Sequence, residues 1–129
     1  MWAIDISPDE HEQLVVTGED SGAVRCCRMT ENGNEMIWEV PRAHKDRVYA
    51  VVFEPVTGKV VVTCGKDNKV NVRDAASGQL LDTQDLPDIG LSAVFTPDGS
   101  HFLAGYAGGS RVFRWADGKA LPVGADLPH

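Results

Sequence analysis

The feature that most constrains this chain is an internal repeat with a period of about 43 residues. Three segments begin alike, at Ala3, Ala50 and Ala93, and each runs through apolar residues to a proline-containing turn. Between the second and third segments, matching residues lie 42 positions apart. The pairs are Phe53 and Phe95, Pro55 and Pro97, Val70 and Val112, and Arg73 and Trp115. The 129 residues therefore hold three copies of one structural unit.

Each repeat has the pattern of four short strands separated by turns. In the second repeat, residues 48–53 and 59–64 are strongly apolar, which is typical of strands covered on both faces. Residues 69–73 alternate valine with polar residues, which predicts a half-exposed strand. Residues 79–83 are more polar, as expected near a sheet edge. No segment has a convincing helical period, so the sequence predicts an all-β fold.

The charge and the cysteines exclude several classes of protein. The net charge is −7, so we expect no binding to nucleic acid or to an anionic membrane. The chain has no apolar run that could span a membrane, and its start lacks the segments of a signal peptide. Its three cysteines cannot all pair with one another and show no CxxC spacing, so we expect a reducing compartment, the cytoplasm or the nucleus.

Set side by side, the repeats resemble the WD40 family. Ala43 and His44 stand where that family has Gly-His, and the run KVNVRD stands where a family strand ends in Trp-Asp. The third repeat has Trp115 at the tryptophan position, and the first has Cys27 there. The resemblance covers essentially the whole chain and implies four-stranded antiparallel blades of a β-propeller. It divides one propeller segment, 1–129, into blades at about 1–44, 45–86 and 87–129.

The resemblance also implies a buried polar network in blade 2. In the family this network joins a histidine, a Ser or Thr, an aspartate and a tryptophan, which correspond here to His44, Thr63, Asp67 and, in place of the tryptophan, Arg73. A buried histidine needs a partner for each ring nitrogen, so a structural role is favoured over a catalytic or metal-binding one. The corresponding positions are Thr17 and Ser21 in blade 1, without a histidine, and Leu86, Gly105 and Gly109 in blade 3. We expect those two blades to rely on packing.

Partners of WD40 proteins often bind the rim that bears the turn between the second and third strands. The resemblance assigns partner contacts to particular positions on that rim. They are Trp2 and Asp20 in blade 1, Arg47, Tyr49 and Lys66 in blade 2, and Ile89, Leu91 and Gly108 in blade 3. Aromatic and arginine side chains are the usual anchors of protein interfaces, so Trp2, Arg47 and Tyr49 are the first choices. In the alternative interpretation, Trp2 and Tyr49 pack against a neighbouring blade.

The function predicted from these features is a non-enzymatic scaffold that binds a protein or peptide. The sequence offers no nucleophile with an adjacent base, no paired carboxylates and no metal cluster, so we expect no catalytic residue, no metal and no cofactor. Two alternatives stay open. The chain could be a self-assembling or excised part-propeller without independent activity, or a propeller that carries an enzymatic or small-ligand site on its rim or channel.

Closed propellers have four to eight blades, so three blades leave two faces uncovered. Two copies would give six blades and three copies would give nine, which predicts a homo-oligomer. By the repeat register, His129 occupies the Gly-His position of a following blade. We expect His129 of one copy to approach Thr17 and Ser21 of the next copy. A longer natural chain cut at a repeat boundary would end in the same way.

Overall fold

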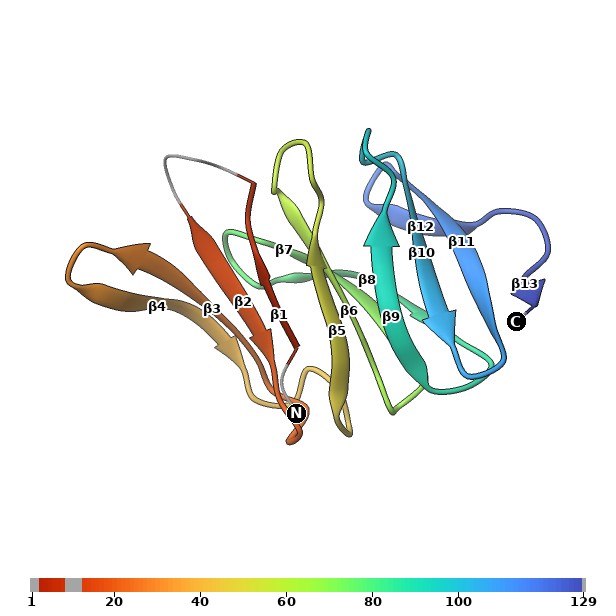
Figure 1. Cartoon of the computed structure of the whole chain (residues 1–129), viewed down its shortest axis with the longest axis horizontal. Helices are drawn as coiled ribbons and strands as arrows, with labels where there is room; N and C mark the ends of the chain where they lie inside the picture. The colour runs from red at the N-terminus through yellow and green to blue at the C-terminus, as the bar shows by residue number, and fades with distance from the viewer. Residues whose placement is uncertain (1–2, 9–12, 129) are drawn as a thin grey trace.

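The computed structural model describes residues 3–8 and 13–128, in which thirteen strands form three antiparallel sheets. The sheets stand side by side, and their first strands, β1, β5 and β9, are neighbours in space (Figure 1). The all-β prediction is confirmed for these residues. No helix among them has the length and apolar character that a membrane crossing would need. The arrangement is an arc of three propeller blades and not a closed ring.

The strand order within each sheet follows the chain, as in the blades of a propeller. Blade 1 consists of β1 (Ala3–Ile6), β2 (Leu14–Gly18), β3 (Val24–Thr30) and β4 (Gly33–Val40). Blade 2 consists of β5 (Val48–Phe53), β6 (Val60–Gly65), β7 (Lys69–Asp74) and β8 (Leu80–Asp85). Blade 3 consists of β9 (Gly90–Phe95), β10 (His101–Tyr106), β11 (Gly109–Ala116), β12 (Lys119–Pro122) and β13 (Leu127–Pro128).

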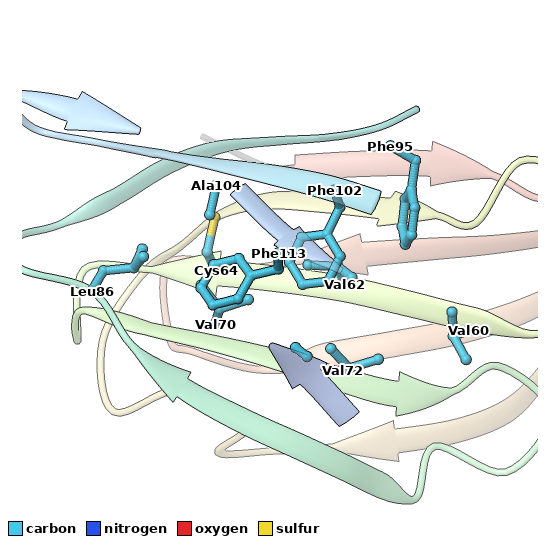
Figure 2. Packing of buried hydrophobic residues seen from close by; sticks show 11 residues of the cluster. Val60, Val62, Cys64, Val70, Val72, Leu86, Phe95, Phe102, Ala104 and Phe113 are labelled. Atoms are coloured by element: carbon cyan, nitrogen blue, oxygen red, sulfur yellow. The ribbon is translucent and has the colours of Figure 1, made fainter. Parts of the chain in front are cut away.

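Two hydrophobic clusters hold the blades together, one at each junction. Side chains alternate between the two faces of a strand, so blade 2 contributes to both clusters. Val61 and Phe53 pack against blade 1, where the indole N–H of Trp38 also donates a 2.8 Å hydrogen bond to the carbonyl of Ala75 in blade 2. On the other face, Val62 and its neighbours meet an aromatic group from blade 3 (Figure 2). That group is Phe95, Phe102 and Phe113, and the ring centroid of Phe102 lies 5.4 Å from that of Phe95 and 5.1 Å from that of Phe113.

The strand β7 is more deeply buried than its alternating pattern predicts. Val70 and Val72 face blade 3, as expected for the apolar set. The polar positions between them, Asn71 and Arg73, are also buried, at 5% and 8% exposure, because blade 1 and the connection before β5 cover that face. The prediction of a half-exposed strand was therefore wrong, since alternation describes the residues but not what covers each face.

Blade 3 departs from the constant spacing of 42 residues. Phe53 lies opposite Val61, whereas Phe95 lies opposite Phe102, because the turn after Phe95 is one residue shorter. The next turn is shorter again, so Phe113 pairs with Phe102 at the position where Arg73 pairs with Val61. The structural counterpart of Arg73 is therefore Phe113 and not Trp115. A sequence match at constant spacing does not detect two one-residue deletions in turns.

The outer strand of blade 3 is split into β12 and β13, which pair with two different parts of β11. An ion pair fastens the second part. Arg111 donates from Nε and Nη2 to the carboxylate of Asp126 over 2.7 and 2.8 Å, and the hydroxyl of Tyr106 donates to the same carboxylate over 2.6 Å. Arg111 also donates to the carbonyl of Asp85 in blade 2, so this cluster ties the end of the chain to the neighbouring blade.

Candidate functional site

His44, Thr63 and Asp67 lie together at the junction of blades 1 and 2. His44 belongs to the connection between the blades, Thr63 to β6 and Asp67 to the turn after it. The two ring nitrogens of His44 have one partner each: Nδ1 lies 2.8 Å from Asp67 Oδ1, and Nε2 lies 2.8 Å from the hydroxyl oxygen of Thr63. Because an ionised carboxylate only accepts, we assign the ring proton to Nδ1, and Nε2 then accepts from Thr63.

The environment of this histidine favours its neutral form. Burial lowers the pKa of His44, although the hydrogen bond and charge of Asp67 act in the opposite direction. The Asp67 carboxylate also accepts the backbone N–H groups of Lys45 and Lys69, at 3.1 and 3.2 Å. With both ring nitrogens engaged and the side chain 1% exposed, His44 has no free position for a substrate or a metal. The hydrogen bonds of His44 therefore have a structural role, because they attach the connection between blades 1 and 2 to the sheet of blade 2.

Arg73 does not join this network through any hydrogen bond between the described residues. Its Nη1 donates instead to the carbonyl of Gly78 over 3.0 Å, and its Nε has no partner in the described part of the chain. Burial lowers the pKa of Arg73, and its charge also lowers the pKa of His44. Arg73 therefore leaves incomplete, among the described residues, the four-member network that the resemblance implies.

The other blades have no comparable arrangement within the described residues. In blade 1, Thr17 lies on the face that points away from blade 2, and Ser21 accepts from the backbone N–H of Ala23 at 3.4 Å. In blade 3, the strand register places Ala104 at the position of Thr63, rather than Gly105. His129, expected to approach Thr17 and Ser21 of another copy, lies outside the described residues.

The described positions at which the resemblance predicts partner contacts lie along one rim of the arc. The backbone N–H of Lys66 donates to the carbonyl of Arg47 over 2.8 Å, which sets these two exposed cations side by side. The N–H of Val48 donates to the carbonyl of Glu19, so the exposed Asp20 lies in the adjacent turn.

In blade 3, the N–H of Ala107 donates to the carbonyl of Ile89 over 3.1 Å. This bond corresponds to the one between Lys66 and Arg47, so Ala107 and not Gly108 is the counterpart of Lys66. Ile89 is half-buried. Trp2 lies outside the described residues.

Sequence reasoning missed two β-bulges on this rim. In β5, Val48 pairs with Gly65 and Ala50 with Cys64, so Tyr49 between them is the extra residue. In β9, Gly90 and Ser92 pair with consecutive residues of β10, so Leu91 is the extra residue of blade 3. A bulge re-aims the side chain that it carries. Tyr49 is half-buried and Leu91 is 48% exposed, and no sequence signal distinguishes these positions from an ordinary strand residue.

Two of the three thiols are buried. The described residues include no group of three or more His, Cys, Asp or Glu side chains that could hold a metal ion. Burial raises the pKa of Cys26 to about 11 and that of Cys64 to about 12, which leaves both thiols protonated near neutral pH. Cys26 packs in the junction, whereas the adjacent Cys27 lies on the opposite face.

Two comparisons with known proteins place the sequence among WD40-repeat proteins. The family model described as the WD40 domain of anaphase-promoting complex subunit 4 matches residues 8–90. An uncharacterized WD repeat-containing protein of Synechocystis is 39% identical to this chain over 67 residues, which are 50% of this chain and 19% of that protein. The chain thus spans about a fifth of the length of this relative.

Proposed function

Because the chain belongs to the WD40-repeat family, we propose that it is a scaffold that binds a protein or peptide on the rim of blades 2 and 3 and self-associates to close the ring. WD40-repeat proteins are generally non-enzymatic scaffolds, and WD40 domains generally bind protein partners. We further propose a cytoplasmic or nuclear location and partners that are neither nucleic acid nor membrane. The three free cysteines and the net charge of −7 support these two assignments.

The observation that carries the rim assignment is the pair of equivalent bulges. Each places one large side chain, Tyr49 or Leu91, out of the regular ladder at the same level of two neighbouring blades. Beside Tyr49 stand the two exposed cations Arg47 and Lys66. An aromatic residue, an apolar residue and an arginine on the same rim of neighbouring blades fit a peptide that carries an apolar side chain and an acidic group.

A peptide selection tests this assignment. Peptides selected from a random display library against the wild-type chain are expected to lose about tenfold in affinity when Arg47→Ala or Tyr49→Ala is introduced, a change of about 1.4 kcal/mol. The melting temperature should stay nearly unchanged, because Arg47 is exposed and Tyr49 stands outside the strand ladder. Val56→Ser, an exposed position in a turn on the opposite rim, is the matched control. Affinity that survives both rim substitutions would contradict the assignment.

A further inference from the structure

The two outer faces of the arc have the composition of buried junctions. In blade 1, the side chains that alternate with buried Val16 and Cys26 point away from blade 2. We name the surface that they form the blade 1 end face. Strand pairing aligns Ile6 with Val15 and Val15 with Cys27, which forms one row across the sheet. The members of the blade 1 end face are Ile4, Ile6, Val15, Thr17, Arg25, Cys27 and Met36.

The equivalent side chains of blade 2 show what this face is suited to. There, Val51 and Phe53 stand at the positions of Ile4 and Ile6 and are 8% and 3% exposed, because blade 1 covers them. In blade 1 the corresponding isoleucines are 64% and 52% exposed. Two isoleucines side by side on a sheet face are the composition of an interface and not of a solvated surface.

Blade 3 exposes the opposite side of the repeat. Val94 pairs with Leu103 and Leu103 with Val112, so these side chains form a row that points away from blade 2. Leu121 lies on the same face, opposite Arg114. We name these residues the blade 3 end face. Val94 is 57% exposed and Leu121 43%, whereas the side chain of blade 2 that corresponds to Val94, Val52, packs against a buried cluster.

We propose that a second copy of this chain lays its blade 3 end face on the blade 1 end face, head to tail. This pairing names the two surfaces through which the self-association proposed above takes place, and it rests on that proposal. The two junctions inside the chain are built in the same way. In each, one blade contributes the face equivalent to the blade 3 end face, and the following blade contributes the face equivalent to the blade 1 end face. Among the described residues one face of each kind is left uncovered, and a second copy seated there would continue the junction already present inside the chain.

Charge favours the same pairing over contact between like faces. Arg25 of the blade 1 end face forms ion pairs with Glu39, which lies opposite it in β4, and with Glu19, which directly follows β2, so this cluster has one excess negative charge. The blade 3 end face carries two exposed cations. Arg114 lies on it, and Lys119 lies on the same side because it is the strand partner of Ala116 in the sheet. An acidic face and a basic face attract each other, whereas two copies of either face repel.

Charged substitutions at the two end faces test the pairing by native mass spectrometry. The wild-type chain of 14.0 kDa is expected as a dimer of six blades or a trimer of nine. Ile6→Glu on one face and Val94→Glu on the other should each convert the assembly to monomer. An equimolar mixture of the two variants should regain a heterodimer, because the intact blade 3 end face of the first variant meets the intact blade 1 end face of the second.

The control and the contrary outcomes separate this inference from the rest of the proposed function. Val56→Glu introduces the same charge at a valine that is 60% exposed and lies on neither end face, and it should keep the wild-type mass. A folded wild-type monomer would overturn the inference and the self-association together. A dimer that survives either single substitution would overturn the head-to-tail pairing alone. Peptide affinity that depends on Arg47 tests the rim assignment independently, in any of these variants.

Discussion

Blades 1 and 2 share a strand order, but they differ in the polar side chains at equivalent positions and in how their faces are covered. Blade 2 is covered on both faces, and His44, Thr63 and Asp67 fasten the connection to its sheet. Blade 1 has Thr17 at the position of Thr63, on the face that points away from blade 2, and Ser21 at the position of Asp67, in the turn between β2 and β3. The comparison shows that the same strand pattern forms a blade with or without the histidine network, and that the network adds polar contacts only at the junction of blades 1 and 2.

Among the substitutions that test this difference between the blades, removal of the histidine should have the largest effect on stability. His44→Ala leaves the Thr63 hydroxyl and part of the Asp67 carboxylate without partners at a buried junction and opens a cavity. We expect the free energy of unfolding to fall by about 3 kcal/mol. Ser21→Ala, at the position of Asp67 in blade 1, is the matched control and should change it by less than about 0.5 kcal/mol. Urea unfolding measures both, and equal losses would contradict a special role for blade 2.

A second comparison sets the turn of blade 2 against the turn of blade 3. Gly78 and Gly118 both have positive φ, 78° and 74°. A Cβ on Gly78 would come within 2.6 Å of the Trp38 ring, which is held by its hydrogen bond to Ala75, whereas a Cβ on Gly118 would meet nothing within 4 Å. We expect Gly78→Ala to lower the free energy of unfolding by about 2.5 kcal/mol, from backbone strain and the contact with Trp38 together. Gly118→Ala should lower it by about 1 kcal/mol, from backbone strain alone. Similar melting temperatures for the two variants would show that blade 1 does not constrain this turn.

The smallest expected effect is a pH dependence that belongs to His44. Burial holds the pKa of His44 in the folded chain below the ordinary value. Above about pH 6.5 the imidazole of His44 is therefore neutral in both the folded and the unfolded chain. Below that pH, the unfolded chain binds a proton that the folded chain resists, and stability falls. The stability difference between wild type and His44→Ala should therefore narrow as the pH drops below about 6.5. A difference that stays constant down to pH 5 would mean that His44 is charged in the folded state.

Much of the fold was predictable because the repeat carries local information. Residues 48–53 were predicted as a strand and form β5, and the resemblance to the WD40 family implied the histidine network that the structure contains. The counterpart of Arg73 was misassigned to Trp115, because two turns in blade 3 are each one residue shorter. The burial of Asn71 was missed for another reason: a strand pattern does not reveal that the connection before the next strand covers its polar side.

The sequence by itself determined the internal repeat and the short strands within it, since both depend on spacing along a short stretch of chain, and its resemblance to the WD40 family implied the partners of His44. Only the tertiary structure decided which side chains lie at the rim and which at the ends. The bulges at Tyr49 and Leu91 arise from pairing with another strand, and the exposure of Ile4 and Val94 depends on whether a blade stands beside them. Pairing and coverage bring together residues that are far apart in the chain, and no local pattern records them.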